Sequence, residues 1–220
     1  MLELTIKALC KEAHLFSAFQ SKSPEKTLYG VTDGKAVGTY LERKFRDHLK
    51  TRYDFQEGSS ASGIDFPKLH VDMKVTSIRQ PQFSCPFKSA RQKIYGLGYS
   101  LLIFVYDKID NQEKQTAILN ILHTVFVEAE STADFQMTSG LRHILANHGN
   151  RDDIIAFLQD RNLPVDEIEM NDLADEIISN PPVQGFLTIS NALQWRLQYS
   201  RVIERAGLEQ GVLAIYRANE

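Results

Sequence analysis

The sequence predicts an α/β protein, with a mixed central sheet flanked by helices and a helical C-terminal part. Two observations support this prediction. Through the first 134 residues, helix and strand patterns follow one another in the order helix, strand, strand, helix, strand, which layers helices onto a sheet. Beyond residue 134 the composition changes and several short helical patterns follow. We therefore expect a core at 1–134 and a helical C-terminal subdomain at 135–220.

Two amphipathic helices are expected before residue 50. Apolar residues recur at steps of three and four over residues 2–16 and again over residues 37–49, so each helix has one apolar stripe. Residues 21–34 are rich in Ser, Pro, Gly and Asp and are predicted to form a loop. Glu42 lies beside the stripe of the second helix, not on its far polar side.

The strands of the core follow this second helix. The most strongly apolar of them, 100–106, has no polar alternation and is typical of a strand covered on both faces. The segment 80–88 contains two prolines and is predicted to be irregular. The other predicted elements of the core are strands at 64–66, 69–78 and 117–127, a turn at Pro67-Lys68, and a short helix at 88–97.

Charge is divided unevenly along the chain, although the net charge is only -3. Residues 35–108 contain 13 Lys and Arg against 7 Asp and Glu, a net charge of +6. Residues 109–180 contain 4 against 14, a net charge of -10. A nucleic-acid partner requires a positive local potential, not a positive total. The first segment is therefore compatible with such a partner.

The C-terminal part is predicted to be mainly helical. Short helices are expected at 141–146, 152–159 and 173–178, a longer one at 188–204, and a final strand at 211–216. Such an arrangement either contacts DNA, as helix-turn-helix and winged-helix modules do, or packs around the core. Packing is favoured slightly, because the acidic segment would repel phosphate.

No feature of the sequence indicates export or a membrane. Glu3 lies where a signal peptide needs an apolar stretch. The longest apolar run, 101–106, is too short to cross a bilayer. We therefore expect a cytoplasmic protein.

The pattern that points to chemistry is Asp65, six further residues, and then Asp72-Met73-Lys74. Alternate side chains of a strand share a face, so Asp72 and Lys74 should project together. If Asp65 lies on the neighbouring strand, its carboxylate can face Asp72. Two close carboxylates repel each other unless a cation separates them, and Mg²⁺ prefers such oxygen ligands.

Lys74 and Glu42 complete this candidate site. The ammonium group of Lys74 could orient an attacking water and stabilise developing negative charge, while Glu42 could supply a third carboxylate from the adjacent helix. The alternative is a surface hairpin with a solvated salt bridge. Apolar flanks favour the catalytic interpretation, because they place the strands in a core: Ile64, Phe66, Val71, Met73 and Val75.

These residues resemble a known signature. Glu42, Ile64-Asp65-Phe66-Pro67 and Val71-Asp72-Met73-Lys74-Val75 look like the motif of the PD-(D/E)xK nucleases, especially type II restriction endonucleases, with a spacing similar to that of MutH. The resemblance implies a restriction-endonuclease-like core and one or two Mg²⁺ ions per active site. The implied ligands are Asp65, Asp72 and the backbone carbonyl of Met73, with Glu42 assisting and Lys74 acting on the attacking water. Two departures are Ile64, which replaces the proline of the motif, and Asp72, which replaces the commoner Glu.

The function implied by this resemblance is magnesium-dependent hydrolysis of phosphodiester bonds in double-stranded DNA at a short specific sequence, as by a type II restriction endonuclease. Such enzymes usually act on palindromes as homodimers, and a cognate DNA methyltransferase is expected as a separate protein. Two alternatives stay open. One is a repair-type or structure-specific nicking nuclease, and the other is a non-catalytic DNA-binding protein in which Asp65 and Asp72 are structural.

Several residues near the motif have side chains suited to DNA. Arg and Lys contact phosphates, and Gln can read base edges. For each of them alone, a solvated surface position is the simpler interpretation. The candidates are Arg43, Arg79, Gln80, Gln82, Lys88, Arg91, Gln92 and Lys93.

Overall fold

A mixed sheet runs through the centre of the protein. The computed structural model describes residues 1–58, 63–85, 89–190 and 195–218. The strand order is β10-β7-β6-β4, and a short strand β2 also pairs with β7. Only β4 and β6 are parallel, whereas the other pairs are antiparallel. The mixed α/β architecture predicted from the sequence is therefore confirmed. The strands are β2 (Pro24–Glu25), β4 (Val71–Ser77), β6 (Ser100–Asn111), β7 (Thr116–Val127) and β10 (Val212–Arg217).

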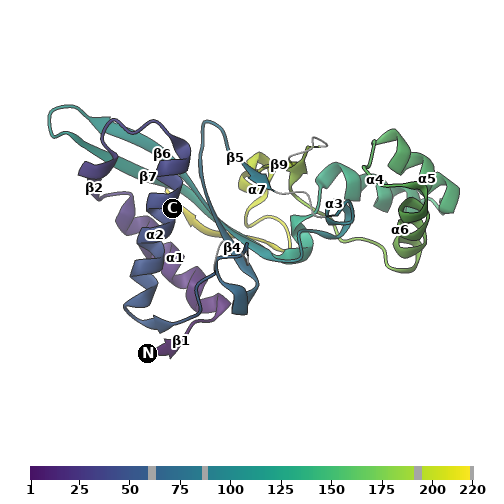
Figure 1. The fold of residues 1–220 in the computed structure, drawn as a ribbon, viewed down its shortest axis with the longest axis horizontal. Helices are drawn as coiled ribbons and strands as arrows, with labels where there is room; N and C mark the ends of the chain where they lie inside the picture. Colours follow the sequence, from purple (N-terminus) through teal and green to yellow (C-terminus); the bar gives the residue numbers. More distant parts are fainter. Residues whose placement is uncertain (59–62, 86–88, 191–194, 219–220) are drawn as a thin grey trace.

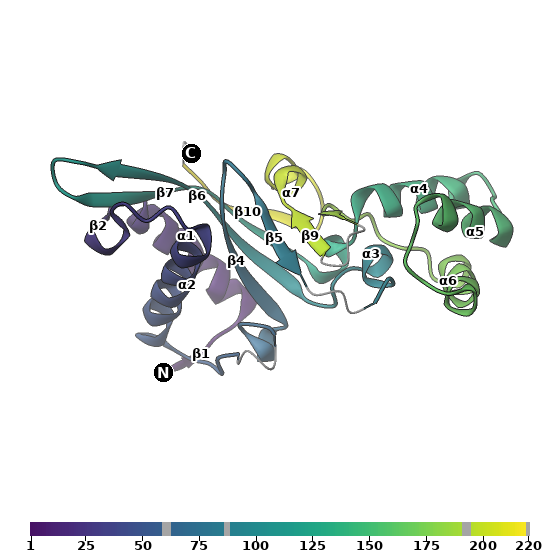
Figure 2. The same cartoon turned by 45° about the horizontal axis from the view of Figure 1, so that its top comes forward.

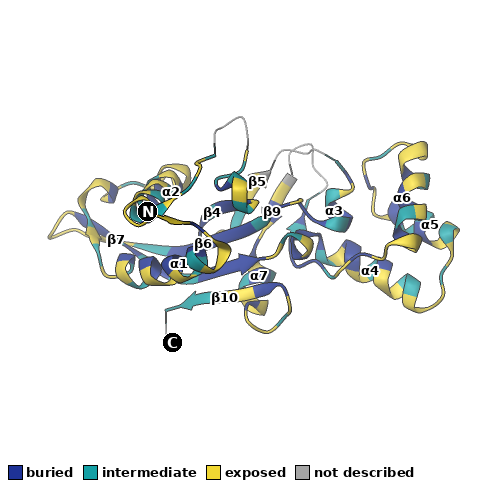
Figure 3. Cartoon of the chain, turned by 90° about the horizontal axis from the view of Figure 1, so that it is seen from below, coloured by how far each residue is buried: buried dark blue, intermediate teal, exposed yellow. Residues whose placement is uncertain are grey.

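Both faces of this sheet are covered, as the apolar run at 100–106 predicts. Leu102 and Phe104 of β6 pack beneath the helices α1 (Ile6–Gln20) and α2 (Gly34–Lys50). Leu101 and Ile103 face the other way, toward α7 (Ser200–Arg205). Figure 3 shows the buried strands between these exposed helical surfaces.

The first helix starts later than its apolar pattern predicts. Thr5 is its N-cap, and the Thr5 hydroxyl accepts a hydrogen bond from the Ala8 N–H at 3.2 Å. Leu2 instead belongs to β1 (Leu2–Glu3), which pairs with β3 (Tyr53–Asp54), and its side chain is exposed. The second helix follows its prediction closely. Asp33 caps its start, and the predicted stripe is buried: Val37, Leu41, Phe45 and Leu49.

A second, three-stranded sheet has the order β5-β9-β8 and lies between the central sheet and the helical part (Figure 2). Its strands are β5 (Gln82–Cys85), β8 (Thr188–Ile189) and β9 (Trp195–Gln198). Two predictions were wrong here in part. In the segment 80–88, predicted to be irregular, Gln82–Cys85 forms a strand, and in the helix predicted at 188–204 only the end, from Ser200, is helical. Residues 86–88 and 191–194 lie outside the described residues. In β9 and the residue after it, burial alternates with a period of two, because Leu197 and Tyr199 are buried and Arg196 and Gln198 are exposed. Pairing with the distant β5 decides this conformation.

Four helices at the other end of the long axis have a hydrophobic cluster of their own (Figure 1). They are α3 (Gln92–Tyr95), α4 (Phe135–Ala146), α5 (Arg151–Asp160) and α6 (Glu167–Ser179). The helix predicted at 88–97 is thus only one turn long, and β10 returns from this half of the chain to the central sheet. The division into 1–134 and 135–220 stays a prediction. The described residues also contain three 3-10 turns: Lys26–Leu28, Pro67–Leu69 and Ala129–Thr132.

In the described part of the chain, no helix has both the length and the apolar character needed to cross a membrane.

A buried carboxylate joins α1 to the end of α2. The side chain of Glu12 is 3% exposed. Its carboxylate lies 2.9 Å from His48 Nε2, accepts a hydrogen bond from Arg52 Nη1 at 2.9 Å and another from the Tyr53 hydroxyl at 3.2 Å. Burial raises the pKa of Glu12, but the hydrogen bond with His48 and the charge of Arg52 outweigh burial and leave it below the ordinary value of 4.5.

We expect this cluster to make stability depend on pH. A carboxyl group with a lowered folded-state pKa stabilises the fold above its ordinary pKa and loses that contribution as the pH falls through the lowered value. The free energy of unfolding, measured in urea, should therefore decrease as the pH drops below about 4.5. In Glu12→Gln this decrease should be smaller. Glu3→Gln, at an exposed position, is the control. Parallel stability curves for the wild type and Glu12→Gln would contradict the expectation.

Candidate active site

Asp72 and Lys74 project from the same face of β4. Their side chains form an ion pair, with Lys74 Nζ 2.7 Å from Asp72 Oδ2. The intervening Met73 points the other way, into the cluster that holds α1 and α2. The alternation predicted from the sequence is therefore confirmed. Because β4 is the last strand of the central sheet, its outer edge is open to other groups.

Asp65 approaches that outer edge from an irregular segment, not from the predicted strand at 64–66. Only Phe66 forms an isolated bridge, with Val71, and Pro67 follows it with no N–H to extend the pairing. The expected proximity is nevertheless present, since Asp65 Oδ2 accepts a hydrogen bond from the Met73 N–H at 2.9 Å. The N–H and C=O of one strand residue point to the same side, so the Met73 carbonyl also faces this edge.

Gly58 positions Asp65. The Gly58 N–H donates a hydrogen bond to the Asp65 carbonyl at 2.9 Å. A Cβ atom at this position would lie 1.7 Å from the carbonyl oxygen of Ile64. Only glycine therefore allows this approach of the two backbones, and a larger residue would displace Asp65 from the edge of β4.

The helix α2 contributes Glu42 and Arg46. Glu42 is half-buried, and no hydrogen bond or ion pair links its carboxylate to another described residue. Arg46, one turn later, has Nη1 2.7 Å from Asp65 Oδ1. Arg46 is not among the residues predicted from the sequence. Its spacing from Glu42 was the available signal, because residues four apart share a helix face.

These groups line one cleft of about 400 Å³. The structure thus brings together the four predicted catalytic residues: Glu42, Asp65, Asp72 and Lys74. Phe83 of β5 closes one side, with its ring centroid 4.6 Å from Lys74 Nζ.

Carboxylates crowd this cleft. Burial raises the pKa of Glu42 to about 7, and repulsion from Asp65 adds to the effect, while Lys74 and Arg46 partly oppose it. Burial also raises the pKa of Asp72 to about 6, where Lys74 opposes the shift and a hydrogen bond with Asp65 increases it. The described cleft lining thus has two cations, Arg46 and Lys74, against four carboxylates, Glu42, Glu57, Asp65 and Asp72.

The donor set suits a hard divalent cation. Carboxylate and carbonyl oxygens from Glu42, Asp65, Asp72 and Met73 face the cleft, and its described lining contains no His or Cys. As they stand, Asp65 and Asp72 are paired with Arg46 and Lys74. Within the described ranges, no three Asp, Glu, His or Cys side chains converge as a ready metal site. A cation would therefore have to compete with these two ion pairs.

Four of the predicted DNA contacts lie at the surface. Arg43 and Arg79 have side chains 82% and 78% exposed, with Asp47 and Asp107 as their ion-pair partners at 3.8 and 3.4 Å. Gln80 and Gln82 line a groove next to the cleft.

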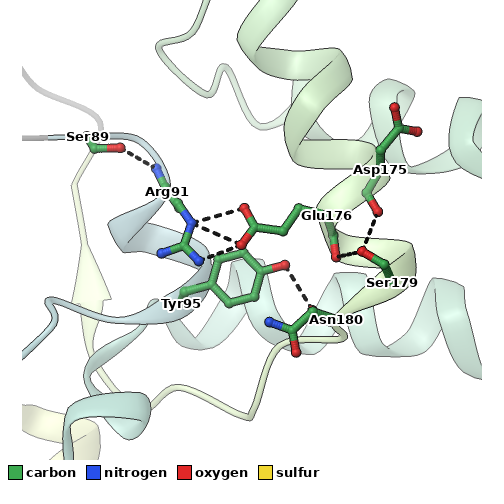
Figure 4. A network of polar contacts seen from close by, with 7 residues as sticks. All are labelled: Ser89, Arg91, Tyr95, Asp175, Glu176, Ser179 and Asn180. Carbon is green, nitrogen blue, oxygen red and sulfur yellow. Dashed lines mark hydrogen bonds and ion pairs between the residues drawn. The ribbon is translucent and has the colours of Figure 1, made fainter.

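The other four lie toward the helical part or outside the described residues. Arg91 donates hydrogen bonds to both carboxylate oxygens of Glu176 on α6 at 3.0 and 3.1 Å and stacks on Tyr95 (Figure 4). Gln92 donates to the Leu97 carbonyl at 3.0 Å, and Lys93 is 4% exposed. Lys88 lies outside the described residues.

Known proteins similar to this chain are type II restriction enzymes. A family model described as type II restriction enzyme NspV matches residues 3–214. The curated type II restriction enzyme NspV of Nostoc sp. (strain ATCC 29411 / PCC 7524) is 73% identical over 219 residues, which cover 100% of both chains. No solved structure matches the chain. Of the functions considered from the sequence, these findings support the restriction endonuclease. The chain belongs to the NspV family of type II restriction enzymes and is a site-specific endonuclease of double-stranded DNA.

Proposed function

We propose that the cleft on β4 is the active site and that its cofactor is Mg²⁺. The observation that supports this most directly is the convergence of Glu42, Asp65, Asp72 and Lys74 from three separate segments on one cleft. Asp65, Asp72 and the Met73 carbonyl would hold the ion, with Glu42 as a further oxygen ligand. When bound, Mg²⁺ supplies positive charge that stabilises the phosphate oxygens in the transition state.

The side chains around the ion have separate roles in this proposal. Lys74 orients the attacking water by hydrogen bonding and stabilises negative charge on the phosphate. Phe83 covers the Lys74 ammonium on one side and limits its exposure to solvent. Glu42, with its raised pKa, accepts a proton readily near neutral pH when no cation is bound.

Two-fold symmetric cleavage of both strands would require a homodimer. A separate cognate methyltransferase would protect the host DNA in the cytoplasm.

Incubation with bacteriophage DNA of known sequence tests the proposal. Purified protein should produce discrete fragments with Mg²⁺ and none with a chelator, and the fragment ends should show the same cut on both strands. Fragments that persist in the chelator would overturn the magnesium assignment. Nicks in a single strand would overturn the symmetric homodimer.

We expect Arg46→Ala to change the magnesium requirement. Arg46 and the ion compete for Asp65, because the Arg46 guanidinium is 2.7 Å from Asp65 Oδ1. A partly exposed ion pair contributes up to about 1 kcal/mol, so the Mg²⁺ concentration for half-maximal cleavage should fall up to about fivefold. A Mg²⁺ titration of the cleavage rate measures this, with Arg43→Ala as the exposed neighbour for comparison. A higher Mg²⁺ requirement in Arg46→Ala would contradict the competition.

A further inference from the structure

A groove of about 650 Å³ adjoins the cleft. Phe83 lines both of them. The strand β4, which carries Asp72 and Lys74, continues into the groove with Val75, Thr76 and Ser77. DNA with one phosphate at Lys74 would therefore extend along this groove. The inference that follows rests on the proposed active site, because it takes Lys74 as the position of the cleaved phosphate.

One wall of the groove is the β5–β9 pair. These strands are antiparallel, with Ser84 opposite Arg196 and Gln82 opposite Gln198. Directly opposed residues of an antiparallel pair point to the same face, and alternate residues share that face. Gln82, Ser84, Arg196 and Gln198 therefore form one polar face of the ribbon. The neighbouring residues Leu197 and Tyr199 are buried in the second hydrophobic cluster and hold the ribbon in place.

Arg196 is the cation of this face. Arg196 is exposed and lines the groove. Among the described residues, no Asp or Glu lies within ion-pair distance of it, and none lines the groove. Its backbone is fixed, since the Arg196 N–H donates to Ser190 Oγ at 2.9 Å and the Arg196 carbonyl accepts from the Ser190 N–H at 3.2 Å.

These features match the way proteins read base pairs. The major groove of B-form DNA admits a two-stranded β-ribbon, and arginine forms two hydrogen bonds with O6 and N7 of guanine. We propose that the polar face of the β5–β9 ribbon enters the major groove and that Arg196 determines specificity by contacting a guanine of the recognition site. A phosphate contact is the competing role for an exposed arginine, and the test separates the two.

The test compares wild type, Arg196→Ala and Arg205→Ala in single-turnover cleavage of a duplex with the mapped recognition site. Arg205 is the matched control, an exposed arginine of α7 whose partner is Glu209. Further duplexes carry 7-deazaguanine, which lacks the N7 acceptor, at one guanine at a time. At one of these positions, the substitution should slow the wild type and Arg205→Ala by about 5- to 150-fold. On the unmodified duplex, Arg196→Ala should cut more slowly than the wild type by a similar factor. The 7-deazaguanine at that position should not reduce the cleavage rate of Arg196→Ala any further.

Two results would overturn the proposal. In the first, Arg196→Ala responds to every 7-deazaguanine as the wild type does. In the second, Arg196→Ala weakens binding to unrelated duplexes as much as binding to the recognition site. The slope of log affinity against log salt concentration then also falls by about 1, as expected for the loss of one phosphate contact. Thermal unfolding confirms that the variant is folded.

Failure of the proposed active site has a different outcome. If the wild type does not cut with Mg²⁺, sequences bound from a random duplex pool in Ca²⁺ are compared between the wild type and Arg196→Ala. Loss of one guanine preference in the variant supports the role of Arg196 without any cleavage, and an unchanged preference overturns it.

Discussion

Replacing Lys74 with alanine should lower the rate of DNA cleavage by at least about 10³-fold. The Lys74 ammonium is the cation on β4 that lies in the cleft beside Asp72 and beneath Phe83. Without it, neither the attacking water nor the negatively charged phosphate oxygens have this hydrogen-bond donor. Single-turnover cleavage with saturating Mg²⁺ measures the effect, and binding of the cognate duplex should persist.

Lys108→Ala is the matched control for this variant. Lys108 also forms an ion pair with an aspartate two residues away on a strand, Asp110 of β6, but it does not line the cleft. Its removal should leave the cleavage rate within about twofold, because Lys108 lies outside the cleft. Lys74→Ala leaves the buried Asp72 without its partner, so thermal unfolding must be measured as well. A folded Lys74→Ala that cuts at the wild-type rate would remove Lys74 from the active site.

Phe104→Ala should lower the free energy of unfolding by about 3–5 kcal/mol. Phe104 is 0% exposed at the centre of the sheet. Its ring contacts Phe45 of α2 with centroids 5.1 Å apart and Phe16 of α1 with centroids 6.0 Å apart. Removal of the ring leaves a cavity between the sheet and both helices, and this loss is comparable to much of the stability of an ordinary domain. The midpoint of guanidinium unfolding measures it.

Phe19→Ala provides the comparison, because Phe19 is on α1 as well but is 67% exposed. Its effect should stay within about 0.5 kcal/mol. Because Phe104 supports α2, which carries Glu42 and Arg46, partial loss of cleavage by Phe104→Ala below its unfolding transition is also expected. Equal stability of the two variants would mean that the aromatic cluster does not hold the helices on the sheet.

The elements whose burial follows a local period can be predicted from the sequence alone. The stripe of Val37, Leu41, Phe45 and Leu49 determines a helix, and the alternation in 71–75 places Asp72 and Lys74 on one face of β4. Glu42 followed from the same argument, because its position beside the stripe brings it near the sheet. In each case, neighbouring residues in the sequence contain the whole signal.

The contacts between distant segments become visible in the folded structure and have no local signal in the sequence. Asp65 reaches β4 through a single bridge and the approach of Gly58, and Arg46 meets Asp65 across the cleft. Arg196 lies opposite Ser84 because β9 pairs with a strand more than 100 residues earlier. Such pairings depend on packing against the rest of the fold and not on local propensity. The segment 188–204 was therefore predicted as one helix, whereas the structure has the strands β8 and β9 there and a helix only from Ser200.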